Sequence, residues 1–298
     1  MVAACFRFRM KANIQPPKLR LGLSCAVAVF VLVRPCAAHP DLIDQINQLT
    51  TQLKAQGESA DGLEQRAELY RRHGQFEMAL IDIAAAERLA TNSTTLILVK
   101  ARIFCDAGMA QPAFATIQKF LRNETNHAEG LSIRARCEAR LKQPDAAIAD
   151  YTTAIKLFPA PMVDLYLERA RQQALLGKLD DAVCGLDEAM NQSSPLPVLQ
   201  MTAIEYDRQR GAFDSALRRV DGFVNQYPVK EPWLTLCAEI LEQAGRKREA
   251  TETFQQVITG IEKYSTVRRG LELTKQLEAR ARQGFARAQI LTTTPPKL

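Results

Sequence analysis

The histidines and cysteines are the side chains of this sequence that could bind a metal or carry redox chemistry. The three histidines are His39, His73 and His127, and no two of them have the spacing of a metal-ligand pair. Beyond residue 38 the cysteine spacings of 32, 47 and 53 residues match no zinc or redox motif; these cysteines are Cys105, Cys137, Cys184 and Cys237. Because each falls in a segment with helical periodicity, we expect four buried free thiols rather than disulfides.

Recognisable catalytic motifs are missing from the sequence. It contains no glycine-rich phosphate loop, no nucleophile elbow and no paired-carboxylate motif. Its acidic side chains are spread as they are on the solvated surface of helices. We therefore expect neither catalysis nor a bound cofactor.

The charge of the chain is basic overall, but the excess is confined to one end. The 298 residues carry a formal net charge of +6, from 39 basic and 33 acidic side chains. The first 38 residues hold six of the basic groups and no acidic group, so the remainder has 33 of each. This balance gives no support to nucleic-acid binding. A composition of 47% hydrophobic and 24% charged residues also excludes a polytopic membrane protein or a wholly disordered chain.

The first 38 residues have the pattern of an export signal. Residues 21–33, LGLSCAVAVFVLV, form an uncharged apolar run behind a basic segment, with either Met1 or Met10 as the start. Small residues follow at 36–38, where a signal peptidase cleaves. We predict cleavage between Ala38 and His39 and an exported chain, periplasmic or secreted, with no membrane span after cleavage. The alternative is an uncleaved anchor, although thirteen apolar residues are fewer than the roughly 20 that span a bilayer.

An internal repeat of about 34 residues organises the chain beyond the signal. One alanine per unit marks its register, with spacings of 34, 34, 35, 34 and 34 residues: Ala79, Ala113, Ala147, Ala182, Ala216 and Ala250. Twelve residues before these register alanines lie Ala67, Ala101, Ala135, Ala170, Ile204 and Ala238. Five residues before them lie Gly74, Gly108, Lys142, Gly177, Gly211 and Gly245. A repeated supersecondary unit is the expected cause of such a period.

Each unit has the pattern of two helices joined by a tight turn. An apolar stripe at helical spacing runs up to the glycine, and a second stripe begins two or three residues after it. Glycine readily takes the left-handed conformation that ends a helix. The alanines are small enough to let the two helices approach closely. The unit therefore predicts a pair of antiparallel helices.

This pattern resembles the tetratricopeptide repeat (TPR), over about residues 60–263. The clearest unit contains YLERARQQALLGKLDDAVCGLDEAM, whereas Pro112 and Ile204 depart from the family pattern. The resemblance implies an all-α fold, a right-handed α-solenoid of six helix pairs at about 60–93, 94–127, 128–162, 163–196, 197–230 and 231–263.

Both ends of the repeat array are expected to be capped. A helix in 39–59 would present Leu42, Ile46, Leu49 and Leu53 on one face. A helix in 264–290 would use Leu271, Leu273, Leu277 and Ile290, and residues 291–298 would form a flexible tail.

The TPR resemblance also implies a binding site on the first helices, which line a concave groove in that family. Its ligand positions correspond here to an arginine ladder followed by acidic groups, and the candidate residues are Arg102, Arg136, Arg140, Arg171, Glu205, Arg208 and Glu239. Glu64 and Glu68 stand where co-chaperones of this family carry a lysine–asparagine clamp, so that clamp is absent. The alternative is that these arginines are solvated or paired with neighbouring acids, such as Arg171 with Glu168.

The resemblance implies a non-catalytic scaffold that binds a protein or an extended peptide, with acidic segments suited to the arginines. It implies no nucleic-acid partner. The alternative of another class is an exported enzyme, or a metal- or cofactor-binding protein, with its site in the groove or at an N-terminal His39.

Overall fold

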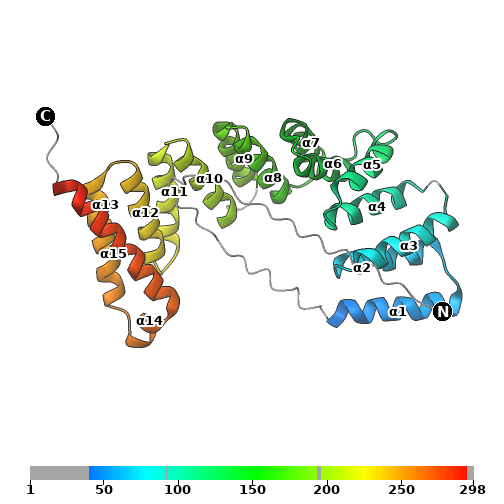
Figure 1. The fold of residues 1–298 in the computed structure, drawn as a ribbon, viewed down its shortest axis with the longest axis horizontal. Coiled ribbons are helices and arrows are strands. Elements are labelled where there is room, and N and C mark those ends of the chain that lie inside the picture. Colours follow the sequence, from blue (N-terminus) through cyan, green and yellow to red (C-terminus); the bar gives the residue numbers. More distant parts are fainter. Residues whose placement is uncertain (1–39, 92, 193–195, 294–298) are drawn as a thin grey trace, which may run out of the picture. The chain divides into compact units, whose positions relative to one another are not determined.

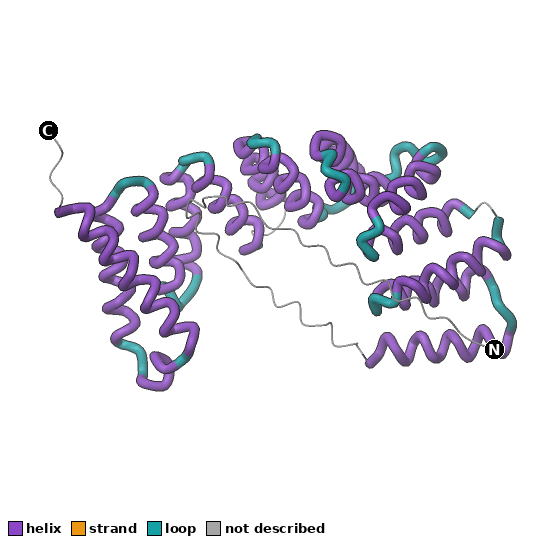
Figure 2. Tube along the Cα trace, in the orientation of Figure 1, coloured by secondary structure: helices purple, strands orange, loops and turns teal. Residues whose placement is uncertain are grey.

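The computed structural model describes residues 40–91, 93–192 and 196–293. Within these ranges the chain forms fifteen α-helices and no strand (Figures 1 and 2). The helices are α1 (Pro40–Gln56), α2 (Ala60–Arg72), α3 (Phe76–Leu89), α4 (Thr94–Asp106), α5 (Ala110–Leu121), α6 (Ala128–Arg140), α7 (Pro144–Leu157), α8 (Val163–Leu175), α9 (Leu179–Gln192), α10 (Pro197–Gln209), α11 (Phe213–Gln226), α12 (Glu231–Gln243), α13 (Lys247–Glu262), α14 (Thr266–Gly270) and α15 (Glu272–Thr293).

Helices α2 to α13 form six pairs, each joined by three residues, and each helix packs on the next along the chain. The first helices of neighbouring pairs also contact one another from α2 through α4, α6 and α8 to α10. The all-α solenoid inferred from the repeat is therefore confirmed. These first helices together form one face of the array, which we call the first-helix face.

The turn within each pair has the conformation that its glycine predicts. Gly74 has a φ of +81°, and the N–H of Gln75 donates to the carbonyl oxygen of Tyr70 to close the end of α2. The same bond from the residue after the left-handed position recurs in all six pairs, and it is the 6→1 bond of a Schellman cap. Lys142 takes the glycine position in the third pair with a φ of +61°.

The register alanines lie where paired helices touch. All six are 0% exposed, and the residues twelve positions earlier, five alanines and Ile204, are at most 1% exposed. Larger side chains fill the space around them, such as Ile83 beside Ala79 and Tyr151 beside Ala147. The alanines thus set the distance between helices, as the repeat pattern predicted.

Partly buried ion pairs with the same spacing cross from the first to the second helix in the first and third units. Arg66 binds Asp82 at 2.6 Å, and Arg134 binds Asp150 at 2.5 Å. In each pair the two residues are sixteen positions apart in the sequence, and the second pair lies 68 positions after the first. These pairs were not anticipated, although the spacing of 68 residues, two periods, is visible in the sequence. They hold the two helices of a unit in one register.

The two caps differ in how they pack. Leu42, Ile46 and Leu53 bury one face of α1, as expected. At the other end the segment is divided at Leu271, whose ψ of 136° ends α14, and α15 continues to Thr293.

The face that α15 buries is centred on small residues, with Leu277 and Phe285 packed beside them, so the expectation for Leu277 is confirmed and that for Leu271, which is exposed, is wrong. Ala281 and Ala288 are 0% exposed, whereas Leu273 is 81% exposed, so the expectation that Leu273 packs on the array is wrong. A Cβ added at Gly284 would lie 2.3 Å from the ring of Phe254 in α13. This close approach explains why a glycine and two alanines lie at the centre of the contact.

The four cysteines are free thiols, as predicted, but they are not all buried. Cys105 and Cys137 are buried, Cys237 is half-buried and Cys184 is exposed. The expectation that Cys184 is buried is therefore wrong, because it lies on the solvent side of α9.

The predicted signal, its cleavage point at Ala38 and His39, and the end of the tail at 294–298 lie outside the described residues. Among the helices that are described, none is long and apolar enough to cross a membrane.

Replacing a register alanine tests the close packing of the helix pairs. Ala147→Leu should lower the free energy of unfolding by roughly 1–3 kcal/mol, because the larger side chain has no space at a fully buried position. Ala149→Leu, at an exposed position of the same helix, is the matched control and should change stability by less than about 0.5 kcal/mol. Chemical unfolding measures both, and equal losses would contradict the assigned contact.

Glu138 predicts a pH-dependent stability. Its side chain is buried beside Arg134 and Asp150, one carboxylate oxygen has no hydrogen bond, and burial followed by repulsion from Asp150 raises its pKa to about 7. The folded state then binds more protons than the unfolded state between pH 4.5 and pH 7. This group should therefore reduce stability as the pH rises through that window, by an amount on the order of 3 kcal/mol.

Glu138→Gln should remove that loss, so its stability relative to the parent should improve from pH 5 to pH 7.5. Urea unfolding at both pH values measures the change, with Glu124→Gln at an exposed loop position as the control. A difference between Glu138→Gln and the parent that is the same at both pH values would show that Glu138 does not titrate there.

Candidate functional site

The first-helix face carries the three arginines of the predicted ladder, on three successive units. Arg102 lies in α4, Arg136 in α6 and Arg171 in α8, at equivalent positions of their helices. The repeat thus places them in a row along the face. Their surroundings differ, and this decides which of them is available to a ligand.

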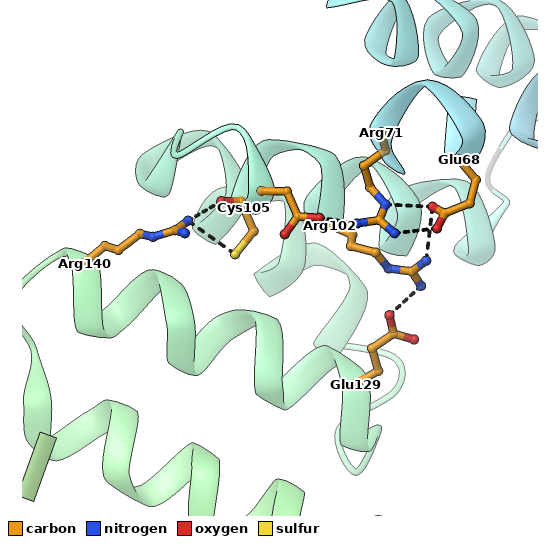
Figure 3. Close-up of polar contacts among 7 residues, drawn as sticks. Glu68, Arg71, Arg102, Cys105, Glu129 and Arg140 are labelled. Carbon is orange, nitrogen blue, oxygen red and sulfur yellow. Dashed lines mark hydrogen bonds and ion pairs between the residues drawn. The ribbon is translucent and has the colours of Figure 1, made fainter. Parts of the chain in front are cut away.

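Arg102 is held in a network of charges from neighbouring units (Figure 3). One guanidinium nitrogen lies 3.3 Å from Glu68 in α2, and the other lies 2.5 Å from Glu129 in α6. Arg71 binds Glu68 at 2.5 Å and also pairs with Asp106 at the end of α4. Burial would raise the pKa of Glu68, but hydrogen bonds and charge from Arg71 and Arg102 hold it below its ordinary value.

Arg140 and Arg171 also have partners within the chain. Arg171 binds Glu168, one turn earlier in α8, at 3.1 Å, which agrees with the alternative of local pairing. Arg140 donates to the carbonyl oxygen of Cys105, 35 residues away, and its Nη1 lies 3.6 Å from the sulfur of that residue (Figure 3). Arg140 therefore joins the ends of two first helices, although the residue is exposed.

Arg136 differs from the other members of the ladder. It is half-buried, and it has no hydrogen bond or ion pair with any described residue. Burial raises the pKa of Tyr151, and the positive charge of Arg136 lies close enough to oppose that rise. The same charge lowers the pKa of the Cys105 thiol. The middle of the face therefore holds a cation without a carboxylate partner.

The predicted acidic groups lie further along the first-helix face. Glu205 in α10 accepts from Arg208 at 3.3 Å and from Gln209 at 3.0 Å, and Arg208 donates in turn to Gln243 at 2.9 Å. The bond between Arg208 and Gln243 joins α10 to α12.

The C-terminal helix neutralises the acidic end of the first-helix face. Arg280 of α15 binds Glu239 at 2.5 Å through its Nη2, and Arg287 binds Glu242 at 2.9 Å. Sequence reasoning missed this contact, although two arginines seven residues apart on one helix face indicate a pair of charges for a neighbouring helix.

A pocket of about 450 Å³ opens at the other end of the same face, between α1, α2 and α4. Its lining comprises Gln45, Leu49, Glu64, Gln65, Glu68, Leu69, Val99 and Arg102. Burial, and then repulsion from Asp61, raises the pKa of Glu64 above its ordinary value. Sequence reasoning did not foresee that the cap helix α1 supplies one wall.

The site has no arrangement suited to a metal. No group of three or more histidine, cysteine or acidic side chains lies close enough to hold an ion in the parts of the chain that the structure describes. His73 lies at the end of α2 and His127 caps α6 through a hydrogen bond from the N–H of Gly130, 3.1 Å from Nδ1. His39 lies outside the described residues.

Comparison with known proteins identifies similar solved structures. No protein-family model matches the sequence, and no curated protein matches it either. A tetratricopeptide repeat protein from Parabacteroides merdae is 17% identical with a TM-score of 0.52, over 82% of this chain and 93% of that one.

Two further solved structures are similar over a smaller part of the chain. PilW, described as a widely conserved type IV pilus biogenesis factor, is 18% identical with a TM-score of 0.53, over 69% of this chain and 95% of its own. YrrB, described as a TPR protein with an unusual peptide-binding site, is 13% identical with a TM-score of 0.51, over 67% of this chain and 97% of its own. At these identities the similarity concerns the fold.

Proposed function

We propose that this chain, which has the tetratricopeptide-repeat fold, is a non-catalytic scaffold that binds an extended segment of another protein outside the cytoplasm. The segment would lie along the first-helix face, with an acidic side chain opposite Arg136. The proposal names a class of partner, a protein or peptide with acidic groups, and no nucleic acid.

The unpaired guanidinium of Arg136 is the observation that carries this proposal. Among the seven predicted site residues it is the one without a hydrogen bond or ion pair to the described chain. A half-buried cation is partly removed from water without a compensating partner. A carboxylate from a ligand could accept two hydrogen bonds at once from the planar guanidinium.

The regular spacing of the units favours an extended ligand. Packed helices lie about 10 Å apart, and an extended peptide advances about 3.3 Å per residue, so successive units meet side chains about three residues apart. The pocket beside Glu64, next to Arg102, would then accept a polar or basic side chain nearer one end of the segment. YrrB, which is described as having a peptide-binding site, shows that this fold is compatible with peptide binding.

Work outside the cytoplasm rests on the first 38 residues. Their basic segment, apolar run and small residues have the order of a secretory signal. The description of PilW as a pilus biogenesis factor is compatible with a role in the bacterial envelope. We propose a periplasmic or secreted protein on this basis.

Charge reversal at Arg136 tests the binding proposal. The probe is a fluorescein-labelled peptide of about twelve residues with glutamate at every third position, and its binding to the full chain is followed by fluorescence anisotropy. Arg136→Glu should weaken binding roughly tenfold or more, because a charge-assisted hydrogen bond contributes about 1.5–3 kcal/mol. Binding should also weaken with salt, because charges near the surface are screened within about 8–10 Å.

Two controls accompany this experiment. Arg88→Glu makes the same charge change at an exposed position of α3, and a similar change can be made at Arg122, which follows α5; both should leave affinity within about twofold. A peptide with glutamine in place of glutamate should bind weakly to every variant. Equal affinity of the parent and the Arg136→Glu protein for the acidic peptide would rule out Arg136 as a contact.

N-terminal sequencing tests export. The chain recovered from its native host should begin at His39, because cleavage is expected after the small residues at 36–38. A chain that still carries residues 10–38 would instead indicate a membrane anchor.

A further inference from the structure

Cys105 and Cys137 come together in the interior of the repeat array, although they lie 32 residues apart in the sequence. Cys105 is near the end of α4 and Cys137 is in α6, and they are 1% and 0% exposed. Both belong to the same apolar core, and each thiol lies close enough to the other to shift its pKa. The contact between α4 and α6 therefore brings the two thiols together in one core.

A positive charge lies beside this pair. The guanidinium Nη1 of Arg140 is 3.6 Å from the sulfur of Cys105, and the same group holds the Cys105 carbonyl oxygen (Figure 3). Arg136 contributes a second positive charge to the surroundings of Cys105. Cationic neighbours favour the thiolate, which is the reactive form of cysteine.

We propose that Cys105 and Cys137 form a redox-active pair, in which Cys105 reacts with hydrogen peroxide and Cys137 completes a disulfide. Each residue has a distinct role. Cys105, beside Arg140, is the nucleophile, and Cys137, in the apolar core, is the resolving thiol. The inference is independent of the proposed binding function.

The chemistry takes place in two steps. The Cys105 thiolate attacks one peroxide oxygen, the O–O bond breaks, and Cys105 becomes a sulfenic acid as hydroxide leaves. The Cys137 sulfur then attacks the Cys105 sulfur, which forms the S–S bond and breaks the S–O bond. The proton of the Cys137 thiol leaves with the hydroxyl group as water. Two thiols are oxidised, and one peroxide molecule is reduced.

The acidities of the thiols agree with these roles. The neighbouring Cys137 thiol, and then the charges of Arg140 and Arg136, lower the pKa of Cys105 to about 7 against the opposing effect of burial. The neighbouring Cys105 thiol, and then burial, raise the pKa of Cys137. Burial also raises the pKa of Cys237, to about 11, although the charge of Arg246 opposes the rise. Of these three thiols, Cys105 is therefore the one whose pKa is lowered, towards the reactive thiolate form.

Peptide mapping of the full chain tests the pair. The reduced protein is treated with hydrogen peroxide at pH 7, remaining thiols are alkylated in denaturant, and the tryptic peptides are analysed by mass spectrometry. Peptides 103–119 and 137–140 should appear joined, with the loss of two hydrogens, and should separate on reduction. The exposed Cys184 is the internal control and should remain alkylatable while the pair is oxidised.

Two variants separate the roles of the residues. In Cys137→Ala, the Cys105 sulfenic acid should persist and be trapped by dimedone. Arg140→Gln should slow oxidation of Cys105 at pH 7 roughly twofold to fivefold, because less thiolate is present although each thiolate is more nucleophilic. Cys105 that stays reduced while Cys184 is oxidised, or joined peptides that never form in the parent protein, would overturn the proposal.

Discussion

Close contact between two helices at an alanine is the constraint on which the rest of this structure depends. In every unit the register alanine is fully buried against the partner helix. The turn between the two helices always contains one residue in the left-handed conformation, and the residue after it donates the 6→1 hydrogen bond. Because the six pairs have the same internal geometry, they can pack on one another in the same way. A larger residue at one of these positions would change both the separation within its unit and the contact with the next.

Regular stacking brings each side chain close to the one about 34 residues away. The charged residues at the ends of the first helices use this neighbourhood: Arg71 reaches Asp106, Arg140 reaches Cys105, and Arg208 reaches Gln243. Most of the arginines that the repeat pattern placed on a binding face therefore join one unit to the next. This pairing is incomplete at Arg136, and a pocket opens beside Glu64, so the proposed ligand is placed at these two positions.

The same interlocking explains the chemistry proposed for the thiol pair. Cys105 and Cys137 are not at equivalent positions of their units, yet the contact between α4 and α6 brings their sulfur atoms together. Arg140 crosses between units to bind the backbone of Cys105, and its charge reaches the sulfur as a result. A residue that joins two units thus also places a positive charge beside a thiol.

The sequence by itself determined the repeat, the helix pairs, the turns and the packing alanines, because each depends on spacing along the chain. Apolar residues at helical intervals and a glycine at a helix end act through near neighbours, so the roles of Gly74 and Ala79 follow from their positions in the repeat. Only the tertiary structure decided which charges pair and which thiols are covered. Arg102 binds Glu129, Glu239 binds Arg280, and Cys184 is exposed to solvent. These outcomes depend on side chains from separate helices that compete for the same partners and space. Spacing along the chain does not contain that information.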